Sequence, residues 1–187
     1  MRRLITSLAL ALAVLLDGCA SAPHAPPGLF DAQYNAPYTL ASGDRLRVIV
    51  FGQDALSNSY AVDGSGNISL PLVGFIRAQD LTTQAMERSI EEHLRNGFLR
   101  EPRVAVEVEA YRPFYVIGEV AAAGQYPFVN GMTVQNAIAI AGGFGPRGAR
   151  QSAEITRSVD GQIVTGTVAM TQPVRPGDTI SVRERFF

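Results

Sequence analysis

Side chains able to do acid–base, nucleophilic or metal chemistry are few in this sequence and are not grouped. The two histidines are His24 and His93, and the single cysteine is Cys19. An H-E-x-x-H motif, paired cysteines and a G-x-S-x-G motif are all missing from the sequence, so zinc, redox and hydrolase sites lack their residue types. We therefore expect no catalytic residue, no metal site and no cofactor, and a protein that is not an enzyme.

Three aspartates stand out because they are next to or near glycines at expected turns. Asp44 and Asp178 follow Gly43 and Gly177, and both pairs begin a G-D-x-[LI]-x-V pattern, while Asp63 precedes another turn. An aspartate at such a place accepts hydrogen bonds from nearby backbone N–H groups, and glycine tolerates positive φ. We interpret these aspartates as turn-forming, not metal-ligating. The repeated pattern is too short to indicate a duplicated domain.

Glu119 is the carboxylate with two open interpretations. It ends an apolar run, where it could contact a neighbouring subunit or a sugar hydroxyl, or could cap the turn that follows; the structural role is favoured. Tyr111, Tyr115 and Tyr126 could stack on sugar rings, although aromatic side chains at strand spacing are more often part of a core.

The elements that must position these residues belong to a globular chain of ordinary composition. Of its 187 residues, 47% are hydrophobic and 18% are charged, and the formal net charge is −1. This length allows two small domains with modest cores. The balanced charge gives no electrostatic reason to expect nucleic acid as a partner.

Residues 1–19 have the parts of a secretory signal. Arg2-Arg3 precede the apolar run Leu4–Leu16, which is too short to span a bilayer comfortably. Leu16-Asp17-Gly18-Cys19 resembles a bacterial lipobox, which implies that Cys19 is diacylated and becomes the new N-terminus. Asp17 departs from the small uncharged residue usual at that position. The alternative is an uncleaved anchor, or an ordinary signal peptide with an incidental cysteine.

Residues 20–37 contain five alanines and four prolines and have no apolar period. We expect a flexible tether that reaches at most about 60 Å when extended. Ala20 stands where an aspartate is typical of inner-membrane retention, so the resemblance to lipoprotein signals implies the outer membrane.

The first domain is expected over residues 38–110. Alternation predicts a strand over 45–51, and Ile68, Leu70 and Leu72 at period two predict another. Pro71 inside that run indicates an edge position or a bulge. A helix is expected from Leu81-Thr82-Thr83 to Leu94, and a half-buried strand follows over 104–108.

The second domain is expected over residues 111–187, and its opening unit is Phe114–Phe144. This stretch predicts a strand, a turn, a short strand, and a helix that begins at Thr133 and ends at Gly142-Gly143. Residues 153–157, 162–169 and 179–182 are expected as further strands. The predicted fold class is α+β, with two small domains.

Both domains resemble one family. Residues 38–74 carry Y-x-L-x-x-G-D-x-L-x-V-x-V-F-G and V-D-x-x-G-x-I-x-L-P-L-V-G, which resemble the N-terminal domain of Wza-like polysaccharide biosynthesis/export proteins. Residues 116–144 carry V-x-G-E-V-x-x-x-G-x-Y and G-x-T-V-x-x-A-I-x-x-A-G-G-F, which resemble the start of a β-grasp-like SLBB domain. Ala123 stands where many family members have proline. The motif positions to which we give a structural role are Gly43, Asp44, Val62, Asp63, Gly66, Leu70, Pro71, Gly74, Gly118, Glu119, Val120, Gly124, Gly142, Gly143, Gly177 and Asp178.

The resemblance implies an outer-membrane lipoprotein, facing the periplasm, that takes part in capsular or exopolysaccharide export. It implies a homo-oligomeric ring acting as a passive conduit, with polysaccharide as cargo and an inner-membrane polysaccharide co-polymerase as partner. Longer relatives continue into a C-terminal pore helix, which this sequence lacks after Phe187, so a separate outer-membrane β-barrel is a further expected partner. The alternative is a tethered, monomeric SLBB protein that binds a soluble glycan.

Overall fold

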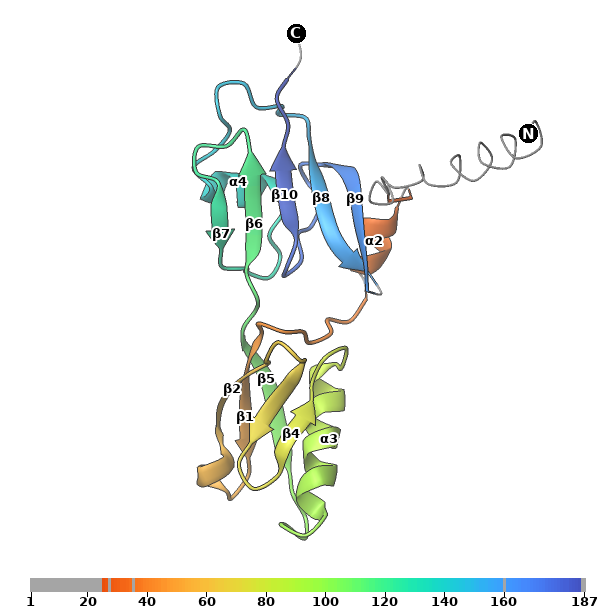
Figure 1. Ribbon diagram of the computed structural model, residues 1–187, viewed down its shortest axis with the longest axis vertical. Helices are drawn as coiled ribbons and strands as arrows, with labels where there is room; N and C mark the ends of the chain where they lie inside the picture. Colours follow the sequence, from red (N-terminus) through yellow and green to blue (C-terminus); the bar gives the residue numbers. More distant parts are fainter. Residues whose placement is uncertain (1–24, 27, 35, 160, 186–187) are drawn as a thin grey trace, which may run out of the picture.

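The computed structural model shows two α+β domains stacked end to end (Figure 1). It describes residues 25–26, 28–34, 36–159 and 161–185. The α+β fold with two small domains is therefore confirmed. Cys19 and the rest of the expected signal lie outside the described residues. No helix among the described residues is both long and apolar enough to cross a membrane.

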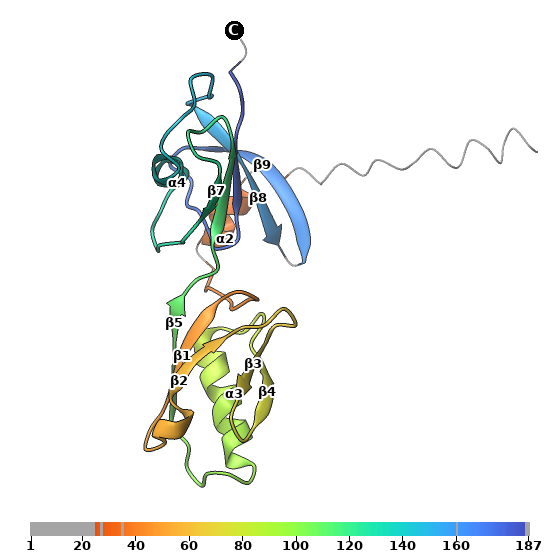
Figure 2. The same cartoon turned by 60° about the vertical axis from the view of Figure 1, so that its left-hand side comes forward.

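The first domain combines a three-stranded antiparallel sheet, a two-stranded hairpin and one long helix. The sheet has the order β2-β1-β5, and β3 pairs with β4. Its elements are β1 (Arg45–Val50), η2 (Asp54–Leu56), β2 (Asn58–Ala61), β3 (Asn67–Leu70), β4 (Gly74–Arg77), α3 (Thr83–Arg95) and β5 (Val104–Ala110). The helix α3 lies beside β5 and the β3–β4 hairpin (Figure 2).

The sequence pattern explains this core. The alternation in β1 buries Leu46, Val48 and Val50 on one face, as a half-buried strand requires. The Thr82 hydroxyl caps α3 by accepting from the Ala85 N–H at 3.2 Å. The buried side of α3 is then made of Met86, Ile90 and Leu94, which have no measurable exposure. Both the strand and the helix are confirmed.

The expected strand through Leu72 is wrong at its end. Ile68 and Leu70 are buried as predicted, but β3 stops at Leu70 and the chain turns into β4. Leu72 lies in that turn with a φ of 70° and is 70% exposed. Pro71 therefore belongs to a turn and not to an edge strand or a bulge. Proline has no backbone N–H to donate to a neighbouring strand, which is consistent with the end of β3 at Leu70.

The second domain is a five-stranded mixed sheet with one short helix. The sheet order is β7-β6-β10-β8-β9, in which β10 pairs in parallel with β6 and all other pairs are antiparallel. Its elements are β6 (Phe114–Gly118), β7 (Gly124–Tyr126), α4 (Val134–Ile140), β8 (Ser152–Val159), β9 (Gln162–Ala169) and β10 (Thr179–Val182). The core lies between α4 and one face of this sheet.

The helix α4 starts and stops where the sequence predicts. Thr133 and Asn136 form a capping box, in which each side chain accepts from the other residue's backbone N–H. Gly142 and Gly143 follow the helix at φ of 83° and 90°, a conformation that glycine adopts without strain.

Part of the expected tether is instead folded against the second domain. Residues Leu29–Tyr34 form the helix α2, which lies beside β9 (Figure 1). Phe30 is buried in the core of the second domain with Phe114, Ile155 and Val164. The prediction of an unstructured segment is wrong here because the apolar surface of Phe30 is removed from water by a domain that comes much later in the chain.

Candidate functional site

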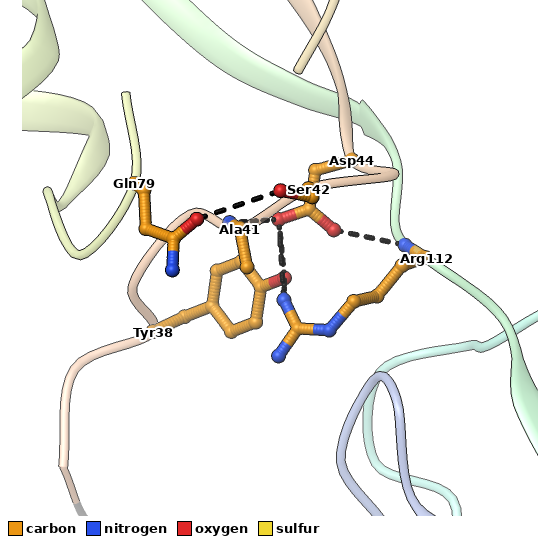
Figure 3. Close-up of polar contacts among 6 residues, drawn as sticks. All are labelled: Tyr38, Ala41, Ser42, Asp44, Gln79 and Arg112. Carbon is orange, nitrogen blue, oxygen red and sulfur yellow. Dashed lines mark hydrogen bonds and ion pairs between the residues drawn. The ribbon is translucent and has the colours of Figure 1, made fainter. Parts of the chain in front are cut away.

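The junction between the two domains is built around the buried carboxylate of Asp44, shown in Figure 3. Asp44 follows Gly43, whose φ is 93°, at the start of β1. Its Oδ2 accepts from the Tyr38 hydroxyl at 2.6 Å and from the Ala41 N–H at 2.9 Å, and its Oδ1 accepts from the Arg112 N–H at 2.9 Å. Asp44 therefore ties the entry of the first domain to the connection leading out of it.

Tyr38 is held neutral by its place in this network. Burial, followed by its hydrogen bond to Asp44, raises the pKa of Tyr38 well above its ordinary value of 10.0. The Tyr38 ring also packs edge-on against Tyr111, which packs edge-on against Phe128 of the second domain. A chain of aromatic rings thus crosses from one domain to the other.

Arg112 is the residue that both domains share. Its Nη1 donates to the Tyr38 hydroxyl at 2.9 Å and lies 3.5 Å from Asp44 Oδ2. On its other side, a Cβ added at Gly177 would lie 2.7 Å from the Arg112 Nε. Gly177 has a φ of 87°, and its N–H donates to the Pro113 carbonyl at 3.0 Å. The chain therefore needs glycine at position 177, both for its backbone conformation and for the space that Arg112 fills.

The second Gly-Asp turn carries its own buried ion pair. Asp178 is fully buried and receives two hydrogen bonds from Arg157, at 2.8 Å from Nε and 2.7 Å from Nη2. The Arg175 N–H also donates to Asp178 at 2.7 Å. Such a paired fork satisfies both buried charges. Burial, and then repulsion by Arg157, lower the pKa of the Arg175 guanidinium from its ordinary value.

A cleft of about 840 Å³ lies between these two turns. It is lined by backbone and side chains of residues 36–42 on one side and by Arg157, Arg175 and Asp178 on the other. Gln79 and Asp80 close a further wall. The lining offers guanidinium, hydroxyl and amide groups without a nucleophile beside a base. Such a surface can hold a polar ligand.

The remaining motif residues are dispersed and shape turns within each domain. Asp63 accepts from the Ser65 and Asn67 N–H groups at 2.8 and 3.0 Å. A Cβ added at Gly66 would lie 2.6 Å from the Gln79 side chain, and one at Gly118 would collide with the Val182 carbonyl. Val62 and Leu70 are core residues. Gly74 begins β4 with positive φ, and Gly124 begins β7. Val120 forms a bridge with Phe144.

Glu119 forms an ion pair in the loops at the far end of the second domain. Its Oε1 lies 3.4 Å from Arg147 Nη2, and Arg147 also contacts Glu184 at 3.2 Å. The Glu119 carbonyl accepts from the Gly145 N–H at 2.8 Å. This geometry gives Glu119 a structural partner within the chain.

The three tyrosines have three different roles. Tyr111 belongs to the aromatic chain of the junction, and the Tyr126 hydroxyl donates to the Ala122 carbonyl at 2.6 Å. Tyr115 is 41% exposed on the open face of the sheet.

His93 lies on α3, with its Nδ1 2.7 Å from the Ser89 carbonyl oxygen. In the described part of the chain, no three His, Cys, Asp or Glu side chains are placed to hold a metal ion.

Sequence reasoning found the two Gly-Asp turns but not what brings them together. Arg112, Arg157 and Arg175 were not singled out, because single arginines in a sequence of balanced charge carry no local signal. The one available clue was Arg112, which stands immediately before Pro113 between the two expected domains.

Comparison with known proteins places both domains. Residues 32–109 match the family model of the polysaccharide biosynthesis/export protein, and residues 113–168 match the SLBB domain. The first domain of the structure is thus an export-type domain, and the second is an SLBB domain. The order of these two domains supports a protein of the polysaccharide export family.

A similar protein is the exopolysaccharide production protein ExoF of Rhizobium meliloti (strain 1021). It is 36% identical to this chain over 118 residues, which are 57% of this chain. The match spans 28% of the relative's own length.

Proposed function

We propose that this protein takes part in the export of capsular or extracellular polysaccharide. The observation that carries the proposal is the order of the two matched domains, an export domain followed directly by an SLBB domain. The description of the relative as an exopolysaccharide production protein supports the same process. The mechanism we propose is passive conduction, in which the protein forms part of a homo-oligomeric ring around the polymer and performs no covalent chemistry.

Two features support a ring subunit. The first is stiffness, because the domains are joined both by the connection at Arg112 and by the segment at Ala36, whose carbonyl accepts from Arg175 Nη2 at 2.9 Å. The second is the open face of the five-stranded sheet. Tyr115, Thr179, Thr156 and Thr165 form one row across β6, β10, β8 and β9. A row of hydroxyl groups suits contact with a neighbouring subunit or a hydrated polymer.

We further propose that Cys19 anchors the protein by lipid to the outer membrane, with both domains in the periplasm. The proposed partners are further copies of this chain, an inner-membrane polysaccharide co-polymerase and a separate outer-membrane β-barrel. The exposed side chains of Phe51, Leu72, Phe75 and Phe98 in the first domain are apolar surface that a protein partner would cover.

Deletion of the gene tests the role in export. We expect loss of surface polysaccharide, restored by the wild-type gene supplied in trans. Native mass measurement of the detergent-extracted protein tests the ring, which we expect as a single high oligomer. Normal surface polysaccharide in a clean deletion strain would defeat the export proposal.

The cleft between the domains favours a second candidate, a tethered monomer that binds a soluble glycan. Its volume of about 840 Å³ falls in the range of small-ligand sites. Titration of the protein with oligosaccharides from the producing strain distinguishes the two candidates. Saturable binding to a monomer, lost in Arg175→Ala, supports the binder; a stable ring without such binding supports the conduit.

A further inference from the structure

An excess of positive charge lines the cleft between the two domains. The charged side chains of its described lining are Asp80, Arg112, Arg157, Arg175 and Asp178. Three guanidinium groups therefore meet two carboxylates there. Which of these charges is already paired within the protein decides what the cleft can bind.

Four of the five lining charges already have a partner of opposite sign. The pairs are Arg157–Asp178 at 2.7 Å, Arg112–Asp44 at 3.5 Å and Asp80–Arg77 at 3.8 Å. Asp44 and Asp178 are fully buried, so their negative charge is used inside the protein and is not offered to a ligand. Each pair is neutral as a whole, and together they leave the excess charge of the cleft on Arg175.

Arg175 is a half-buried cation without a carboxylate of its own. The ion pairs formed among the described residues do not include its guanidinium. Its Nη2 donates to the neutral carbonyl of Ala36 at 2.9 Å, whereas a guanidinium has five N–H donors to offer. Burial, and then repulsion by Arg157, lower the pKa of Arg175, as expected of a cation held beside another cation. An anion in the cleft would relieve that repulsion.

Neutral polar groups surround this cation on both walls of the cleft. Ser42 Oγ donates to Gln79 Oε1 at 3.4 Å, a long hydrogen bond that a ligand hydroxyl can replace. Thr39 and Ser158 also line the cleft and are exposed. Hydroxyl and amide groups of this kind both donate and accept, which suits the hydroxyl groups of a sugar. The volume of about 840 Å³ is in the range of small-molecule sites.

We propose that this cleft binds a sugar residue that carries a carboxylate, and that Arg175 recognises its charge. A carboxylate matches the planar fork of a guanidinium and can form two parallel hydrogen bonds with it. The sugar hydroxyl groups then contact the polar walls that the two domains provide. The choice of a sugar rests on the proposed role in polysaccharide export. The site serves a ring subunit and a monomer alike, because its lining residues come from one chain.

The preference for charge is tested by calorimetric titration of the detergent-extracted, full-length protein with methyl glucuronide and methyl glucoside. The two probes share one sugar ring and differ in a single group, a carboxylate in the first and a hydroxymethyl group in the second. We expect saturable binding of methyl glucuronide, at least about tenfold tighter than that of methyl glucoside, because a hydrogen bond between charged groups is gained. Equal affinity for both probes, or no saturable binding of the glucuronide, would overturn the proposal.

The role of Arg175 is tested by removing its charge. In Arg175→Gln we expect the affinity for methyl glucuronide to fall by about tenfold or more, while the weaker affinity for methyl glucoside changes little. Arg103→Gln is the matched control. It removes the same charge from an exposed position before β5, at the end of that strand remote from the junction. Unchanged glucuronide binding in Arg175→Gln would overturn the assignment of Arg175.

A measurement on the wild type decides the matter even if Arg175→Gln does not fold. The Nε–H signal of Arg175 in NMR spectra is assigned by its absence from Arg175→Lys, which keeps the positive charge. We expect this signal to shift on addition of methyl glucuronide and not of methyl glucoside. Inorganic phosphate is the third probe. If phosphate binds as tightly as the glucuronide and displaces it, the cleft is a simple anion site and the recognition of a sugar is overturned.

The outcomes separate this site from the proposed export role. Glucuronide binding at Arg175, combined with normal surface polysaccharide in the deletion strain, would leave the site intact and contradict the export role. Loss of surface polysaccharide on deletion, combined with no glucuronide binding, would contradict the site and leave the export role intact.

Discussion

The two Gly-Asp turns of this protein have nearly the same local geometry but stabilise different things. In each, a glycine with positive φ precedes a fully buried aspartate. Each aspartate accepts from the backbone N–H three residues before it, Ala41 for Asp44 and Arg175 for Asp178. Each turn then leads into a strand whose alternate side chains are buried. The difference lies in the residues outside the turn that hydrogen-bond to each carboxylate.

Asp178 finds such a residue inside its own domain, whereas Asp44 finds such residues at the domain boundary. Asp178 is joined by a two-pronged ion pair to Arg157 of β8. Asp44 is joined to Tyr38 before the domain and to Arg112 after it. A short turn motif therefore sets the conformation, and the surrounding fold decides whether the carboxylate stabilises a core or a junction.

The largest expected effect tests the internal role of Asp178. Asp178→Ala leaves the Arg157 guanidinium, which is 5% exposed, without its carboxylate, and we expect the free energy of unfolding to fall by about 3–5 kcal/mol. Urea unfolding measures this change. The control is Asp63→Ala, which removes an aspartate from an exposed turn. If both variants lose the same stability, the buried pair does not account for the effect of Asp178.

The next effect tests the junction role of Asp44. Asp44→Ala leaves the Tyr38 hydroxyl and two backbone N–H groups without their acceptor, and we expect a loss of about 2–3 kcal/mol. A double-mutant cycle with Arg112→Ala should give a coupling energy of about 1 kcal/mol or more. The matched cycle between Asp178 and Arg112 should give a much smaller one. Equal coupling in both cycles would remove the distinction between the turns.

Local patterns in the sequence predicted the elements that carry these turns. Alternation located β1, the turn at Gly177-Asp178 located β10, and the caps Thr82 and Thr133 located both main helices. Leu72 was misplaced because period two continues through a turn as easily as through a strand. Nothing in the local pattern distinguishes the two cases, since the decisive feature is the pairing of β3 with β4.

The candidate site was predictable only in part, for a reason that lies in its connectivity. Gly43-Asp44 and Gly177-Asp178 were recognisable as turns. That Arg112 contacts both of them follows from the stacking of two domains, which no window of sequence contains. Phe30 is the same kind of case. Its place among polar and proline residues indicates a tether. Phe30 is a core residue only because its ring packs closely against Gly166 of β9.

A smaller effect compares the two glycines. Gly177→Ala and Gly43→Ala both force a side chain into positive φ, which costs about 1–2 kcal/mol each. The new Cβ at position 177 would also lie 2.7 Å from Arg112 Nε, whereas at position 43 it would lie 3.3 Å from Arg112 Cβ. We expect Gly177→Ala to be the more destabilising by thermal unfolding. In an Arg112→Ala background, which removes Nε but keeps Cβ, the two should become similar; a difference that persists there would show that Arg112 is not its cause.

The smallest effect concerns alkaline pH and belongs to the Asp44 turn alone. Burial and the hydrogen bond to Asp44 raise the pKa of Tyr38 above its ordinary value of 10.0. The unfolded chain therefore releases the phenol proton near pH 10, while the folded chain retains it. The stability that this provides is complete below pH 10 and is lost as the pH rises towards the folded-state pKa.

Tyr38→Phe removes this proton, so its unfolding free energy should fall less steeply above pH 10 than that of the wild type. Below pH 10 it should be modestly less stable, because a hydrogen bond to a charged group is lost. Burial also raises the pKa of Tyr60, so some alkaline loss should remain in the variant. Tyr115→Phe, on the open face of the sheet, is the control. Parallel pH profiles for wild type and Tyr38→Phe would contradict this prediction, because they would mean that the phenol at the junction ionises as freely as in the unfolded chain. The Asp44 turn would then differ from the Asp178 turn in connectivity but not in its response to pH.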